Sequence, residues 1–123
     1  MAGNNQLSCL AKRDLLNEQS ASADVLLSWA QHFVERELLP DAVDFYEKAG
    51  AKDQLHELLK VAVEEGDAFL FKRINRCLGR GPEQQEWLLL ASNAQRLGKD
   101  AFALEALRQA GVETAAAAPS ATP

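Results

Sequence analysis

The sequence predicts an all-α protein of about three helical hairpins preceded by one further helix, and three observations carry this prediction. Apolar residues recur at spacings of three and four, which is the pattern of an amphipathic helix. Glycines follow these stretches, and glycine readily takes the left-handed conformation found just past a helix end. No segment shows the sustained alternation of apolar and polar residues, bounded by turn residues, that marks a strand.

The first two predicted helices span residues 5–18 and 24–38. The apolar face of the first comprises Leu7, Leu10, Ala11 and Leu15. The apolar face of the second comprises Leu26, Trp29, Ala30, Phe33 and Val34. Small residues within 19–23 indicate a link, so we expect residues 1–23 to form a helix and a link ahead of the main body.

The next two helices, 40–49 and 53–65, begin at residues suited to a first turn. Pro40 lacks an N–H that a first turn leaves unbonded in any case, and Asp53 offers an acceptor for free N–H groups. The third helix has an apolar face of Ala42, Val43, Phe45, Tyr46 and Ala49. The fourth has an apolar face of Leu55, Leu58, Leu59, Ala62 and Val63.

Three further helices, 67–78, 82–97 and 100–110, complete the prediction, with Asp67, Pro82 and Asp100 as their start signals. Their apolar faces comprise, in order, Phe69, Leu70, Ile74 and Leu78; Trp87, Leu90, Ala91, Ala94 and Leu97; Ala103, Leu104, Leu107 and Ala110. The glycines expected just past helix ends are Gly50, Gly66, Gly79, Gly98 and Gly111. Residues 114–123 are rich in alanine with two prolines, so we expect a disordered tail.

Composition and charge exclude several classes of protein. The net charge is -5 and the isoelectric point is near 5.0, which argues against a nucleic-acid-binding or membrane-surface protein, because both need a basic face. Two cysteines exclude a disulfide scaffold and a four-thiolate zinc site. No apolar run outside the tail approaches the ~20 residues of a membrane span, and the N-terminus resembles no signal peptide. We therefore expect a cytoplasmic protein.

The chain also contains an internal repeat. Trp29-Ala30 aligns with Leu90-Ala91, and residues 47–51 align with residues 108–112. A weaker copy lies between them, with Leu58, Leu59, Ala62 and Gly66. The step is about 30 residues, or one helical hairpin, and such a period is typical of a stacked helical repeat.

These residues resemble the tetratricopeptide repeat (TPR) family. The last unit carries the likeness with Trp87, Leu90, Ala91, Ala94, Gly98, Ala103, Leu107 and Ala110, and the first unit with Leu26, Trp29, Ala30, Phe33, Ala42, Tyr46 and Ala49. In the middle unit, Phe71 and Asn75 occupy places where the family has alanine and an aromatic residue. The resemblance covers about residues 24–111 and implies a TPR-like α-solenoid, so we expect residues 24–113 to form one helical repeat domain.

The resemblance implies a concave groove, lined by the first helix of each hairpin, that binds a peptide or helix of another protein. The groove residues carried over from the family are Leu27, Gln31, Val34, His56, Lys60, Val63, Leu88, Ser92 and Gln95, with Asp24, Glu35, Asp53, Glu64, Gln85 and Arg96 beside them. Leu27, Val34, Val63 and Leu88 would form an apolar strip, which suits a partner segment. The alternative is that the first helix or the tail covers this strip.

A second candidate binding surface is a basic patch of Lys72, Arg73, Arg76 and Arg80 in an otherwise acidic sequence. Residues 72, 76 and 80 share one helix face if the helix runs that far. Such a patch suits an acidic peptide or a phosphate group. The alternative is that these cations complement the dipole at a helix C-terminus.

Catalytic and metal-binding patterns are absent from the sequence. His32 and His56 have no serine or cysteine partner in any recognisable arrangement. Cys9 and Cys77 lie among leucines, so we expect buried, unreactive thiols, and the two cysteines and two histidines lack the paired spacing of a zinc site. We expect no enzyme, no cofactor and no metal.

The function that fits best is a non-catalytic protein–protein interaction module, an adaptor or scaffold. Two alternatives stay open: a protein that assembles with itself, for example as a homodimer, and a helical protein that binds a small ligand between its helices. We expect neither nucleic acid nor a membrane among its partners.

Overall fold

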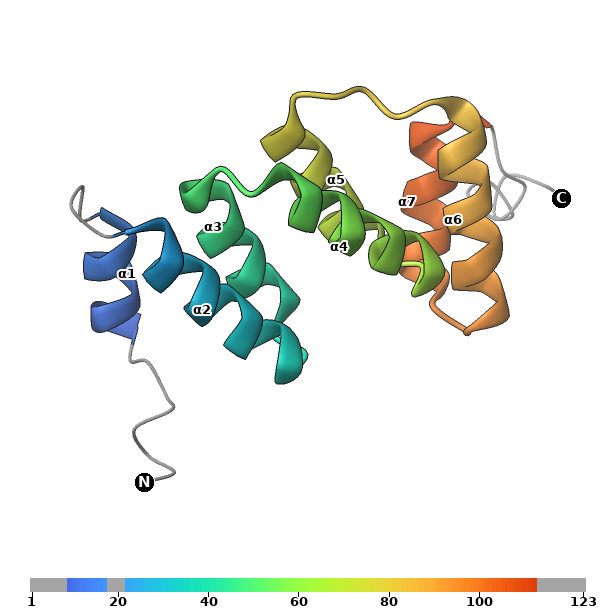
Figure 1. Cartoon of the computed structure of the whole chain (residues 1–123). Coiled ribbons are helices and arrows are strands. Elements are labelled where there is room, and N and C mark those ends of the chain that lie inside the picture. The colour runs from blue at the N-terminus through green and yellow to red at the C-terminus, as the bar shows by residue number, and fades with distance from the viewer. Residues whose placement is uncertain (1–8, 18–21, 113–123) are drawn as a thin grey trace, which may run out of the picture. The chain divides into compact units, whose positions relative to one another are not determined.

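The computed structural model describes residues 9–17 and 22–112, and the regular elements of these residues are all helices (Figure 1). The helices are α1 (Cys9–Asn17), α2 (Ala23–Glu35), α3 (Leu39–Ala49), α4 (Lys52–Glu64), α5 (Ala68–Leu78), α6 (Gln84–Arg96) and α7 (Asp100–Gln109). The all-α prediction is therefore confirmed for this part of the chain. Residues 5–8 and 18 of the first predicted helix, and the predicted tail 114–123, lie outside the described residues.

The helices gather into two compact units, residues 1–52 and 53–123, and each unit is described by itself. In the first unit α2 and α3 pack as a hairpin, and α1 packs on α3. In the second unit α6 and α7 pack as a hairpin, and α5 packs along α7 (Figure 1). The two units meet in sequence at residue 52, inside the stretch 24–113 that was expected to form one repeat domain. Within the described residues, no helix has both the length and the apolar character of a membrane span.

Part of the turn chemistry predicted for the helix ends is confirmed. The five glycines expected there all have a positive φ, between 65° and 79°. At the end of α5, the N–H of Gly79 donates to the carbonyl of Arg76 at 3.1 Å. At its start, the carboxylate of Asp67 accepts from the N–H of Leu70 at 3.0 Å, as an N-cap does.

Gly66 has a second role, because the turn after α4 approaches α6 there. A Cβ atom at this position would lie 2.6 Å from the Cα of Ala94. Its φ of 65° is also a conformation that residues with a Cβ rarely adopt. Both constraints call for glycine, and together they set the turn after α4 directly against α6.

The core of the second unit forms around an aromatic pair. Phe71 of α5 is fully buried and meets Trp87 of α6 edge to face, with ring centroids 4.8 Å apart. The prediction that Phe69 belongs to this core is wrong, because its side chain is 54% exposed and lies against Phe102 of α7. The predicted apolar faces also included Leu97 and Leu104, which are both exposed.

In the first unit, ion pairs join α1 to α3, and the side chain of Leu15, predicted on the apolar face of α1, lies outside the described residues. Leu10 and Ala11, predicted on its apolar face, are exposed. The ammonium group of Lys12 instead pairs with the carboxylates of Asp41 and Asp44 on α3. The amphipathic pattern thus identified the helix but not these ion pairs.

Several helix ends differ from the sequence prediction. Asp53 and Asp100, expected as caps, lie inside the first turns of α4 and α7, and the N-cap of α7 is Lys99. α6 begins at Gln84 rather than at Pro82, because Glu83 is its N-cap and Glu86 accepts from the N–H of Glu83 at 2.8 Å. α2 ends at Glu35 rather than at residue 38, and the chain then turns through Glu37 with a φ of 61°. No glycine marks this second turn, so the sequence carried no signal for it.

Candidate functional site

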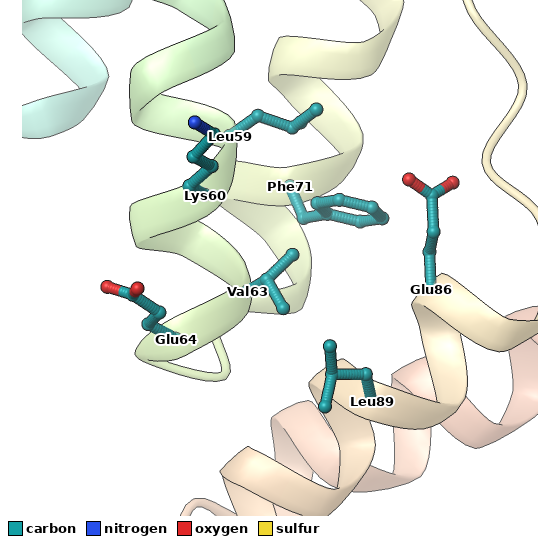
Figure 2. A pocket seen from close by; sticks show the side chains of 7 residues that line it. All are labelled: Leu59, Lys60, Val63, Glu64, Phe71, Glu86 and Leu89. Atoms are coloured by element: carbon teal, nitrogen blue, oxygen red, sulfur yellow. The ribbon is translucent and has the colours of Figure 1, made fainter.

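The second unit contains an apolar groove bordered by α4, α5 and α6, with a volume of about 310 Å³. We call it the α4–α6 groove. It is lined by Leu59, Lys60, Val63, Glu64, Phe71, Glu86 and Leu89. Figure 2 shows Val63 and Leu89 pointing toward each other from α4 and α6, with the ring of Phe71 above them in this view. Helical spacing puts Leu59 and Val63 on one face of α4, and Glu86 and Leu89 on one face of α6.

Hydrogen bonds to the main chain fix the distance between the two walls. The side-chain amide of Asn93, one turn beyond Leu89 on α6, donates to the carbonyl of Val63 at 2.7 Å. The ammonium group of Lys99 donates to the carbonyl of Glu65 at 2.7 Å. These two hydrogen bonds thereby hold the end of α4 near α6 and the start of α7. Leu89 stays 56% exposed, and Val63 is half-buried.

At one end of the groove, Glu86 is held in its charged form. Its carboxylate accepts from the guanidinium group of Arg80 at 2.7 Å and from the N–H of Glu83 at 2.8 Å. Burial raises the pKa of Glu86, but these two hydrogen bonds and the charge of Arg80 outweigh burial, so its pKa lies below the usual value. This carboxylate is therefore committed to the fold.

The other two charges on the rim are available. Lys60 and Glu64 are both exposed and lie one turn apart on α4. Lys60 is 3.6 Å from Glu57, in a solvent-exposed pair of the kind that contributes little. The side chain of Glu64 forms no hydrogen bond or ion pair with any described residue. The rim therefore presents one cation and one anion beside an apolar floor.

The structure distributes the predicted groove residues of the second unit unevenly. Lys60 and Val63 line the α4–α6 groove, whereas His56, Leu88, Ser92 and Gln95 are exposed and do not line it. On α6 the apolar side chain that lines the groove is Leu89, one position beyond the predicted Leu88. Leu88 to Leu90 are consecutive leucines, so apolar character alone could not choose among them. Asn93, at four residues from Leu89, was the available signal for the face turned toward α4.

The remaining predicted groove residues belong to the first unit. Leu27 and Val34 are half-buried on α2, and Gln31 is exposed. The side-chain oxygen of Gln31 accepts from the hydroxyl of Tyr46 at 3.4 Å, and its amide donates to Glu35 at 3.4 Å. Gln31 therefore already has partners within its own unit.

The predicted basic patch surrounds a second hollow, of about 360 Å³. Three of its four cations line this hollow, and the full lining is Lys72, Asn75, Arg76, Arg80, Pro82, Trp87 and Gln109. Arg73 is half-buried and is not part of the lining. The shared helix face was expected only if the helix continued to residue 80, but α5 ends at Leu78. Arg80 therefore comes from the loop beyond the helix.

The histidines and cysteines are dispersed. Within the described residues, no group of three or more histidine, cysteine or acidic side chains is placed to hold a metal ion. His32 lies against the rings of Trp29 and Phe33, and His56 is exposed. The expectation that both thiols are buried is wrong, because Cys9 is exposed and Cys77 is half-buried. Cys9 is the first residue of α1.

A scan against protein-family models, a search of curated proteins and a search of solved structures each found no match. The interpretation of the α4–α6 groove therefore rests on its own side chains. These offer apolar contact, two rim charges and a fixed width, which together suit binding.

Proposed function

We propose that this chain is a non-catalytic protein-interaction module, an adaptor or scaffold, whose α4–α6 groove binds a short amphipathic helix of another protein. The observation that carries the proposal is the pair Val63 and Leu89. These apolar side chains face each other across a groove whose walls are fixed, yet Leu89 remains 56% exposed. A preformed apolar site of this kind lowers the ordering cost of binding.

A TPR-like arrangement of hairpins is part of the proposal. It is supported by the end of α4 being hydrogen-bonded to α6 while α5 packs along α7, since successive hairpins contact each other in helical repeats. The small residues Gly66 and Ala94 at the closest approach also fit such stacking.

The chemistry of the groove selects the class of partner. A volume of about 310 Å³ is at the lower end of ligand pockets and suits one or two leucine-sized side chains of a partner segment. Lys60 and Glu64 are one helical turn apart, and a partner helix with an acidic and a basic residue four apart would pair with both. The proposed partner segment is thus a helix with leucine on one face and opposite charges beside it.

The test is a selection of peptides from a display library of helices with this pattern, using the full chain as bait. Two matched variants of the bait follow, Leu89→Asp in the groove and Leu88→Asp beside it. Both leucines are exposed on the same helix, so both aspartates are compatible with folding. We expect the selected peptides to lose about tenfold or more in affinity with L89D and to keep their affinity with L88D.

Equal binding to the two variants would contradict the proposal, as would a selection that yields no peptide. Light scattering over a range of concentrations covers the self-assembly alternative. If the wild type self-associates and L89D does not, the occupant of the groove is a second copy of this chain, and the adaptor proposal falls.

A further inference from the structure

The hollow lined by Lys72, Arg76 and Arg80, here called the basic hollow, is separate from the α4–α6 groove. The aromatic pair of Phe71 and Trp87 lies between them, with Phe71 lining the groove and Trp87 lining the hollow. The basic hollow is therefore a second candidate binding site, and its lining differs in chemistry from that of the groove.

One cation of the basic hollow is fixed in place by a buried amide. Asn75 is 2% exposed, and its amide donates to the carbonyl of Phe71 at 2.7 Å. Its side-chain oxygen then accepts from the guanidinium group of Arg80 at 2.6 Å, while Glu86 accepts from the same group at 2.7 Å. Arg80 is thus held at both terminal nitrogens, in a loop where a long side chain would otherwise move freely.

A second cation is fixed from α7. The ammonium group of Lys72 donates to the carboxylate of Glu105 at 2.8 Å and lies 5.1 Å from the ring centre of Phe69. The third, Arg76, is exposed and forms no side-chain ion pair or hydrogen bond with any described residue. Two cations are therefore preorganised, and one has all its donors available.

Hydrogen-bond donors remain on all three. A lysine ammonium group has three N–H donors and an arginine guanidinium group has five, and the fold uses one from Lys72 and two from Arg80. Charge also remains. The two carboxylates bonded to these cations are Glu86 and Glu105, and they form ion pairs with Lys72, Arg80 and Arg108. With Arg76, which lines the hollow without an ion pair, the cluster has four cations and two carboxylates. The cluster thus has two positive charges in excess, in a chain whose net charge is -5.

We propose that the basic hollow binds the oxyanion group of a partner protein's side chain, and that this group is a phosphoryl group. A phosphate monoester carries a charge of about -1.5 to -2 at neutral pH and has three acceptor oxygens. That charge matches the excess of the cluster, whereas one carboxylate would neutralise half of it. The guanidinium groups of Arg76 and Arg80 offer the forked donors that phosphate oxygens accept. Trp87 and Pro82 give the hollow an apolar side for the adjoining part of the partner.

The two tryptophans of the chain make the test specific. Trp87 lines the basic hollow, and Trp29 lies in the first unit. The indole N–H resonances of the ¹⁵N-labelled full chain are followed during titration with inorganic phosphate and with three peptides of one sequence. The central residue of the peptides is phosphoserine, glutamate or serine. We expect the phosphoserine peptide and phosphate to shift the Trp87 resonance and to leave the Trp29 resonance in place.

A matched pair of variants tests whether the phosphoryl group binds in the basic hollow. Arg76→Glu reverses the free cation of the hollow, and Arg96→Glu makes the same charge change at an exposed arginine at the end of α6. Neither breaks an ion pair of the fold. We expect R76E to weaken binding of the phosphoserine peptide about tenfold, R76Q to weaken it by less, and R96E to change it by less than twofold.

Three results would overturn the proposal. One is that none of the probes moves the Trp87 resonance. Another is that R76E and R96E weaken binding of the phosphoserine peptide equally, because its affinity would then depend on the net charge of the protein and not on the basic hollow. The third is that single-stranded DNA binds more tightly than the phosphoserine peptide, with an affinity that falls steeply with salt, which would assign the patch to a nucleic-acid backbone. Equal binding of the glutamate and phosphoserine peptides would also overturn the assignment to a phosphoryl group, because a carboxylate would then serve as well.

Discussion

Glu105 offers the sharpest test of how the second unit is held together. Its carboxylate is 8% exposed and joins α7 to α5 through Lys72, with further hydrogen bonds from Arg108 and from Gln109 at 2.8 Å. The hydrogen bonds from Lys72, Arg108 and Gln109 outweigh the effect of burial and lower the pKa of Glu105 from 4.5 to about 2. One pKa unit corresponds to about 1.4 kcal/mol, so the charged form is stabilised by about 3 kcal/mol.

The substitution Glu105→Gln removes this charge and keeps the shape of the side chain. Because Lys72 is 30% exposed and Arg108 is 73% exposed, water replaces part of the lost interaction. We therefore expect the free energy of unfolding at pH 7 to fall by about 2–3 kcal/mol. The matched control is Glu57→Gln, at a carboxylate that is 74% exposed and 3.6 Å from Lys60, where we expect a change below about 0.5 kcal/mol.

The dependence on pH separates charge from packing. A carboxyl group whose pKa is lowered by folding contributes stability above its unfolded pKa and loses it as the pH falls toward its folded pKa. The difference between wild type and E105Q should thus be complete at pH 7 and shrink between about pH 4.5 and pH 2. Urea unfolding monitored by the fluorescence of Trp87, in a Trp29→Phe background, measures it. A difference that is independent of pH would refute the electrostatic explanation.

Three further predictions concern the scaffold, and each is checked against a matched variant or condition. Gly66→Ala should lower the free energy of unfolding by about 3 kcal/mol, since it adds a Cβ against the backbone of α6 at a positive φ. The control Gly50→Ala, with open space around it, should lower it by only about 1 kcal/mol. Urea unfolding measures both, and equal losses would contradict the close approach of Gly66 to α6. Phe71→Ala should cost about 3–5 kcal/mol and Phe69→Ala less than about 1 kcal/mol by the same measurement, and the reverse order would restore the sequence-based assignment. Lys12→Gln should speed amide hydrogen exchange in α1 without affecting α3, as should 1 M salt in the wild type, and unchanged exchange would show that another contact holds α1.

Helix type and helix ends were predictable because they depend on residues close together in the sequence. Glycine past a helix end and Asp67 at a helix start act within one turn, so their signals are complete in the local sequence. Glu37 shows the limit of this reasoning. It takes the same left-handed conformation without being glycine, and no neighbouring residue announces it.

The face that a helix buries was harder to predict, because a distant residue selects it. In α5, Phe69 and Phe71 belong to two overlapping apolar stripes, and only the presence of Trp87 on α6 makes Phe71 the core residue. The same reason explains the choice of Leu89 over Leu88 in the α4–α6 groove. Here the deciding contact, from Asn93 to a main-chain carbonyl of α4, spans 30 positions.

Some charged residues of the candidate sites could be identified from the sequence, and others could not. The sequence could identify Arg76 and Arg80 as part of a basic patch, since they are neighbours in an acidic chain. It could not identify Glu105 as a buried anion, because its partner Lys72 is 33 positions away. The preorganisation of the basic hollow therefore became visible only once α5 and α7 were placed side by side.

The hydrogen bonds from Asn93 and Lys99 end on carbonyl oxygens of the polypeptide backbone. Every amino acid supplies the same carbonyl, so these anchors are indifferent to which side chains occupy positions 63 and 65. Evolution or an engineer can therefore rewrite the rim around Lys60 and Glu64 while the scaffold beneath it keeps its geometry. The residues that hold the groove together, Asn93 and Lys99, are thus different from the rim residues, Lys60 and Glu64, that would set its binding specificity.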